Sequence, residues 1–182
     1  MQLLTRRLSL LAHGLCFTSA SAVVLYPSEV SRAEPDPYTF TVADDLKLND
    51  SQISVARGIE RRMRSHGFSD NLIMGAIVNA YAESKLDPNA VGAAGELGVF
   101  QLNPKGLGSK MKPHEMKDVI NSTDRIIGAV KKNRKMMSLE KKNASATDHV
   151  VAFCTEIERP SNKKRKAKHR VKIMKDIVKK NS

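Results

Sequence analysis

Apolar residues recur every three or four positions in two consecutive stretches near the middle of the chain. The first stretch begins at Asp50 or Ser51, either of which can cap a helix, and Gly67 ends it. The second has Ser69 as its N-cap and runs until Pro88 forces the chain out of the helix. Its apolar stripe consists of Leu72, Ile73, Ala76, Ile77, Ala80 and Tyr81. This pattern predicts an antiparallel pair of helices.

Glycine, proline and asparagine interrupt the helical pattern after this pair. Residues 86–96 are predicted as a loop and residues 97–102 as a short extended run. Helical spacing returns further along the chain, and it predicts helices over residues 113–120, 123–137, 146–158 and 170–179. We therefore expect an α+β fold that is mostly α, with a small β element after the second helix.

The beginning and the end of the chain differ from this central part. Residues 1–33 combine a basic start, an apolar stretch and small residues at candidate cleavage sites, which is the pattern of an export signal. An uncleaved membrane anchor and an ordinary N-terminal helix are the alternatives. Residues 34–49 hold prolines without helical periodicity and are predicted as an extended linker. The folded domain is expected at 50–160, followed by a basic tail or helix at 161–182.

Composition narrows the class of protein. A chain of 182 residues can form one domain with a substantial core, and the absence of Trp argues against a carbohydrate module that stacks sugars on indole rings. The net charge of +12 favours polyanionic partners, namely nucleic acid, acidic lipid or anionic wall polymers. The excess of basic residues is concentrated in residues 161–182.

The cysteines and histidines do not form a recognisable reactive or metal-binding pattern. There are two cysteines, which imply no disulfide framework, and Cys154 lies in an apolar stretch, so it is predicted to be a small buried hydrophobe. The five histidines lack the spacing of a metal site. We expect no metal and no cofactor.

Glu83 continues the apolar stripe of the second helix at its last turn. At 100° per residue it projects within about 20° of Ala76 and about 60° of Ala80. A carboxyl group in that place is partly removed from water, which is the condition that keeps an acid protonated near neutral pH. Such an acid can protonate a glycosidic oxygen. The alternative is an ordinary glutamate at a helix end, paired with Lys85 or solvated.

The residues that follow Glu83 resemble a known signature. Residues 82–90 read AESKLDPNA, and the residues after them that complete the pattern are Gly92, Gly95, Gly98, Phe100, Gln101 and Pro104. This order and spacing resemble the lysozyme-like superfamily, and more narrowly the soluble lytic transglycosylases and the phage tail lysozymes. In those families the helix ends in Glu-Ser, a Pro-x-Ala turn follows, and a glycine-rich segment leads to a Gln before a proline. Residues 121–127 and 153–160 show a weaker resemblance to the same families. Together, the resemblance covers roughly residues 55–165.

The resemblance implies a lysozyme-like fold and a cofactor-free peptidoglycan glycosidase that cleaves the MurNAc-GlcNAc β-1,4 bond with Glu83 as general acid. Attack by water would give hydrolysis, whereas attack by the sugar's own C6 hydroxyl would give a 1,6-anhydro product. The chain departs from the transglycosylase pattern in two places. Glu96 stands where those enzymes usually carry a small or apolar residue, and Val99-Phe100 replaces Leu-Met. Glu96 is therefore a candidate second carboxylate.

Five further residues are candidates for substrate binding. Gly95 and Gly98 lack Cβ atoms and would let a polysaccharide approach the backbone closely. The resemblance implies that Gln101 bonds an N-acetyl group or a hydroxyl, and the alternative is a structural bond to the loop backbone. Ser84 and Tyr81 complete the set.

The neighbouring Glu158 and Arg159 are expected to form an ion pair that closes the domain, with a substrate contact as the alternative.

The expected partners follow from the same features. They are peptidoglycan glycan strands and, through the basic tail, anionic wall polymers. Membrane contact is expected only through the N-terminal segment, and the protein is expected to be exported or virion-associated, as a monomer or a virion component. Two rival interpretations remain: a lysozyme-like structural protein without turnover, and a basic nucleic-acid-binding protein whose tail is the working part.

Overall fold

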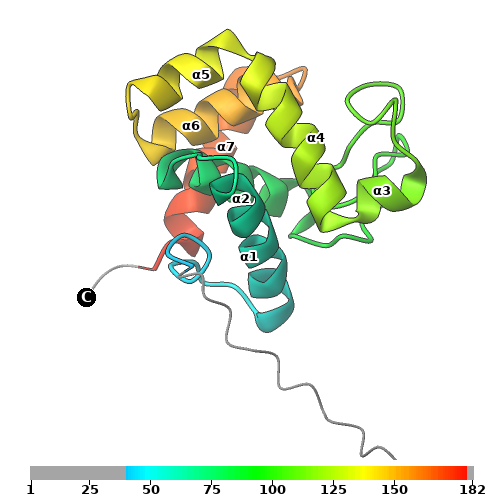
Figure 1. The fold of residues 1–182 in the computed structure, drawn as a ribbon, viewed down its shortest axis with the longest axis horizontal. Helices are drawn as coiled ribbons and strands as arrows, with labels where there is room; N and C mark the ends of the chain where they lie inside the picture. Colours follow the sequence, from blue (N-terminus) through cyan, green and yellow to red (C-terminus); the bar gives the residue numbers. More distant parts are fainter. Residues whose placement is uncertain (1–39, 180–182) are drawn as a thin grey trace, which may run out of the picture. The chain divides into compact units, whose positions relative to one another are not determined.

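The computed structural model describes residues 40–179, so the predicted export signal lies outside the described residues. Helices dominate, as the sequence predicted (Figure 1). They are α1 (Asp50–Arg64), α2 (Asp70–Ser84), α3 (Pro113–Lys117), α4 (Val119–Lys132), α5 (Arg134–Lys141), α6 (Ala146–Ala152), the π-helix η1 (Phe153–Glu158) and α7 (Lys163–Ile177). Within residues 40–179, no helix combines the length and the apolar character needed to span a bilayer.

Helix α2 is the centre of the packing. It contacts α1, α6, α7 and η1, and every residue from Gly75 to Ala80 is buried. Its N-cap is Ser69, as predicted, whose side chain accepts from the backbone of Leu72. The cap of α1 is Asn49, which precedes the two predicted candidates and forms a capping box with Gln52.

Two of the predicted helices are interrupted, because a short polar side chain inside each of them caps the start of a new helix. The predicted helices at 113–120 and 123–137 are replaced by α3, α4 and α5, which break at Asp118 and Asn133. The Asp118 carboxylate accepts from Asn121 N, and the Asn133 side chain accepts from the backbone of Lys135 and Met136. Such side chains offer backbone groups an alternative to helix continuation. As a result α3 and α5 lie at opposite ends of α4 (Figure 1).

The predicted β element after α2 is not confirmed. In the described part of the chain, the segment holds only isolated bridges, which pair Leu97 with Val91 and with Leu102. Residues 98–101 turn back on themselves instead of extending. Gly98 and Gln101 both have left-handed backbone conformations, with φ of 76° and 47°, and these reverse the chain.

The N-terminal part of the described chain is not the extended linker that the prolines suggested. Phe40, Val42, Ala43 and Leu46 are all buried in the core. The backbone of Lys47 donates to the Ile177 carbonyl at 2.6 Å, at the end of α7. The folded domain therefore begins before Asp50, which is where helical periodicity predicted its start.

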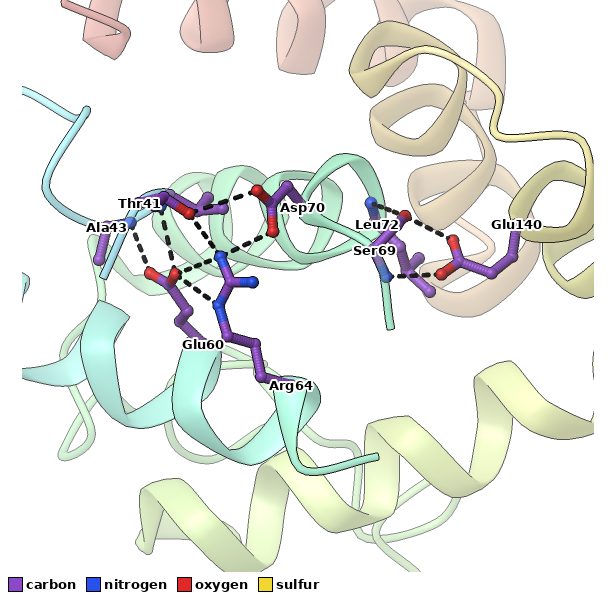
Figure 2. A network of polar contacts seen from close by, with 9 residues as sticks. Thr41, Ala43, Glu60, Arg64, Ser69, Asp70, Leu72 and Glu140 are labelled. Atoms are coloured by element: carbon purple, nitrogen blue, oxygen red, sulfur yellow. Dashed lines mark hydrogen bonds and ion pairs between the residues drawn. The ribbon is translucent and has the colours of Figure 1, made fainter. Parts of the chain in front are cut away.

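A buried carboxylate on α1 anchors this segment. Glu60 is fully buried and accepts from Val42 N at 3.2 Å and from Ala43 N at 2.7 Å. Arg64, one turn later, pairs with Glu60 at 2.8 Å and with Asp70 at 2.6 Å (Figure 2). The charge that α1 buries is thus matched by two backbone donors and a guanidinium.

The basic C-terminal region is also part of the fold. Helix α7 starts at Lys163, earlier than the predicted helix at 170–179, and it packs on α2, α6 and η1. One stripe of it is buried, with Ala167, Arg170, Ile173 and Ile177. The predicted boundary at residue 160 therefore does not separate a tail from the domain, because α7 completes the core.

Candidate active site

A cleft of about 1040 Å³ opens at the end of α2. Its walls come from the end of α2, the loop of residues 92–107, helix α4, and the region from η1 to the start of α7. Phe100 and Phe153 line it, with stacked rings whose centroids lie 6.4 Å apart. The volume lies just above the range of about 300–1,000 Å³ that is typical of small-molecule sites, which suits an extended ligand.

Glu83 lines this cleft because α2 stops directly after it. Lys85 and Leu86 adopt left-handed conformations with φ of 60° and 62°, each at a cost of roughly 1–2 kcal/mol for a residue with a Cβ. Three contacts hold this end: Leu86 is buried, Ser84 Oγ donates to Val99 O at 2.9 Å, and Gln52 Nε2 donates to Lys85 O at 3.1 Å. Local strain of this kind persists where the surrounding structure fixes it.

A buried arginine connects Glu83 to a second carboxyl group. The Arg170 side chain is 2% exposed, and one terminal nitrogen bonds both Glu83 Oε1 and, at 3.2 Å, Glu158 Oε2. Its Nε donates to Asn79 Oδ1 at 3.3 Å. The amide of Asn79 is oriented by donating to Gly75 O and Val150 O, which leaves its oxygen facing the arginine. We call these four side chains the Arg170 cluster.

The electrostatics of the cluster follow from its burial. Burial raises the pKa of the Glu158 carboxyl to about 7, against the lowering effect of Arg170, and the neighbouring Glu83 raises it as well. The Cys154 thiol lies beside the cluster, and burial raises its pKa to about 12, with Glu158 adding to the shift. Cys154 is buried as predicted, and its thiol stays protonated and unreactive.

Glu96 and Gln101 lie in the same cleft as Glu83. Glu96 Oε2 accepts from Ala94 N at 3.1 Å. Gln101 Nε2 donates to Gly98 O at 3.0 Å and to Ala90 O at 3.3 Å, which occupies both hydrogens of its amide. The structural alternative for Gln101 is therefore present: the side chain fixes the loop that forms the cleft wall.

The other predicted binding residues are not among those that line the cleft. Ser84 holds the end of α2, and Tyr81 packs under the Lys85 ammonium, 4.4 Å from the ring centroid. Gly95 lies exposed in a turn. Gly98 is buried, and its α-carbon faces the Met116 carbonyl so closely that no Cβ fits. The requirement for glycine at 98 is thus internal packing.

This difference between the two glycines gives a stability prediction. Gly98→Ala should destabilise the protein by about 3 kcal/mol or more, because the new methyl group collides with backbone and the backbone stays left-handed. Gly95→Ala meets nothing within 4 Å and retains only the left-handed penalty of roughly 1–2 kcal/mol. Urea midpoints of the two variants measure the difference, and equal midpoints would contradict the packing role of Gly98.

Sequence reasoning missed the partner of Glu158. The expected ion pair between Glu158 and Arg159 is absent: Glu158 pairs with Arg170, and Arg159 Nε donates to the Glu156 carbonyl at 2.8 Å. The left-handed conformation of Arg159, with φ of 51°, ends η1 and separates the two side chains. A signal for Arg170 did exist, because it shares three- and four-residue spacing with the buried residues Ala167, Ile173 and Ile177.

Among residues 40–179, the His, Cys, Asp and Glu side chains form no group of three that could hold a metal ion. The chemistry available in the cleft is that of carboxyl groups and basic side chains, with the buried Arg170 guanidinium behind Glu83. The basic residues on its walls are Lys105, Arg125, Lys132, Arg159 and Lys166.

Comparison with known proteins identifies the family. No curated protein and no solved structure matches the chain. The family model described as phage tail lysozyme matches residues 54–180, which is most of the chain and includes α7. This match confirms the lysozyme-like resemblance of the sequence around Glu83 and indicates a role in peptidoglycan cleavage. The chain belongs to the phage tail lysozyme family.

Proposed function

We propose that this protein cleaves the glycan strands of peptidoglycan at the MurNAc-GlcNAc β-1,4 bond, with Glu83 as the general acid. The observation that carries the proposal is the position of Glu83 at the edge of a large cleft. Its side chain is 27% exposed, between a buried polar cluster and the space that a polysaccharide would fill. A carboxyl group in that environment can hold a proton and still reach a substrate.

The proposed reaction begins when Glu83 transfers its proton to the glycosidic oxygen, and the bond from that oxygen to the muramic acid carbon breaks. An oxocarbenium-like state then forms on that sugar. A water molecule completes hydrolysis, or the sugar's own C6 hydroxyl completes a 1,6-anhydro ring. In both routes the attacking hydroxyl returns a proton to the site, so the carboxyl group is regenerated.

Three further carboxyl groups line the cleft beside Glu83, on Glu96, Glu156 and Glu158. Glu96 remains the candidate for a second catalytic carboxylate in a hydrolytic route. The basic side chains suit a substrate that carries carboxylates of its own, as peptide-substituted glycan strands do. The exposed basic face of α7 begins at Lys163 and continues through Lys168 and His169, and it borders the cleft at Lys166.

That basic face is the proposed contact for anionic wall polymers. Binding to cell walls with and without those polymers, at rising salt, measures it. Retention on DNA with no activity on peptidoglycan would instead favour the nucleic-acid interpretation. An export or virion-associated location fits both the family and this substrate.

The proposal is tested by incubating the chain that begins at residue 34 with purified peptidoglycan. We expect soluble muropeptides, which liquid chromatography with mass spectrometry detects. Fragments with 1,6-anhydro ends would establish the lyase route, and fragments with reducing ends would establish hydrolysis. Failure to release any glycan fragment, from a protein that melts cooperatively, would contradict the proposed function.

A further inference from the structure

The Arg170 cluster contains one cation and two carboxyl groups in a poorly solvated place. The Arg170 side chain is 2% exposed, and that of Glu158 is 14% exposed. With both carboxyls ionised the cluster carries an unbalanced negative charge, whereas one bound proton makes it neutral. Because burial disfavours net charge, the neutral state with one proton is the favoured one until the pH rises far enough to remove it.

A second observation indicates where that proton resides. Within the described residues, Glu158 Oε1 is a buried oxygen without a hydrogen-bond partner, while Oε2 faces Arg170. An unsatisfied buried carboxylate oxygen is costly, and protonation removes much of that cost. The raised pKa of Glu158, about 7, agrees with this geometry.

The groups that face Glu158 come from three elements. Arg170 approaches from α7, Glu83 from α2, and the protonated thiol of Cys154 from η1 itself. Arg159 is directed elsewhere by its bond to the Glu156 carbonyl. Glu83 and Glu158 bond the same guanidinium nitrogen, so a change of charge on one carboxyl acts directly on the other.

We infer that Glu83 and Glu158 share the proton that the reaction uses, and that Arg170 holds both carboxyls in the geometry that allows the exchange. This inference rests on the proposed function of Glu83. Before the reaction, the pair holds one proton. When Glu83 gives that proton to the leaving oxygen, both carboxylates are ionised beside a sugar that is becoming positive. The attacking hydroxyl then returns one proton to the pair.

The direction of the pH dependence follows. The pair holds its proton at pH values below about 7 and loses it as the pH rises through that value, so activity should fall on the basic side. In Glu158→Gln the second carboxylate is gone, and Arg170 faces the Glu83 carboxylate alone. An opposite charge without a competing like charge favours the ionised carboxylate, so the proton is lost at a lower pH.

The test is the pH profile of muropeptide release by Glu158→Gln and by the wild type, both beginning at residue 34. We expect the basic limb of the variant's pH profile, where the rate falls with rising pH, to lie at least about one pH unit below that of the wild type. At a fixed pH above the limb, this shift makes the variant about tenfold slower than the wild type. Glu115→Gln makes the same chemical change outside the cleft and should leave the limb in place. An unchanged limb in Glu158→Gln would overturn the inference.

A direct titration covers the case in which the variant does not fold. In the wild type with ¹³C-labelled glutamate carboxyls, carbon NMR should find one carboxyl that keeps its proton up to about pH 7. If every glutamate of a folded sample titrates near its ordinary pKa of about 4.3, the inference fails. The two proposals can fail separately: an inactive wild type contradicts the proposed function, whereas an active enzyme with ordinary titration contradicts only the shared proton.

Discussion

Glu83→Gln should lower the rate of muropeptide release by about 10²- to 10⁴-fold, which is the usual contribution of a general acid. The amide has nearly the shape of the carboxyl group, but it has no acidic proton to give to the leaving oxygen. The cleft keeps its lining, because Phe100 and Phe153 are unaffected. Arg170 keeps Glu158 as an ionic partner, so the cluster should remain assembled.

The rate is measured on purified peptidoglycan at several pH values, together with the melting temperature. Glu115→Gln is the matched control, because its side chain caps α3 away from the cleft and a Gln can accept the same backbone hydrogen bond. We expect that control to retain wild-type activity. A folded Glu83→Gln protein with the wild-type rate would remove Glu83 from the mechanism.

Removing residues 34–49 should destabilise the domain severely. The described part of that segment buries Phe40, Val42 and Leu46, and each such side chain contributes about 1.5–3 kcal/mol when fully buried. The truncation also leaves Glu60 without its two backbone donors, at a further cost of about 1–3 kcal/mol. Together these losses rival the whole stability of a typical domain, about 5–15 kcal/mol.

The comparison is between chains that begin at residue 34 and at residue 50, followed by circular dichroism in urea. We expect the longer chain to unfold cooperatively and the shorter one to be largely unfolded in buffer. Glu60→Gln in the longer chain isolates the role of the buried charge from that of the apolar residues. Equal urea midpoints for the two chain lengths would show that residues 40–49 do not belong to the folded unit.

Residues near one another in sequence determined much of the site. The stripe that begins at Leu72 placed Glu83 on the core side of α2, and Ser69 fixed the start of that helix. The glycine-rich signature after Glu83 was enough to indicate the superfamily, and the family match agrees with it. These features depend on helical periodicity and local capping, which are set by residues close to one another in the sequence.

What the sequence by itself determined is therefore the helical class, the placement of Glu83 at a helix end and the lysozyme-like family. Only the tertiary structure decided that residues 40–46 and α7 belong to the core, and that Arg170 joins Glu83 to Glu158. The physical reason is that a charged residue is predicted to lie on the solvated surface unless the groups that pair with it in the fold are known. The partners of Arg170 lie 87 and 12 positions away, and packing alone brings them together.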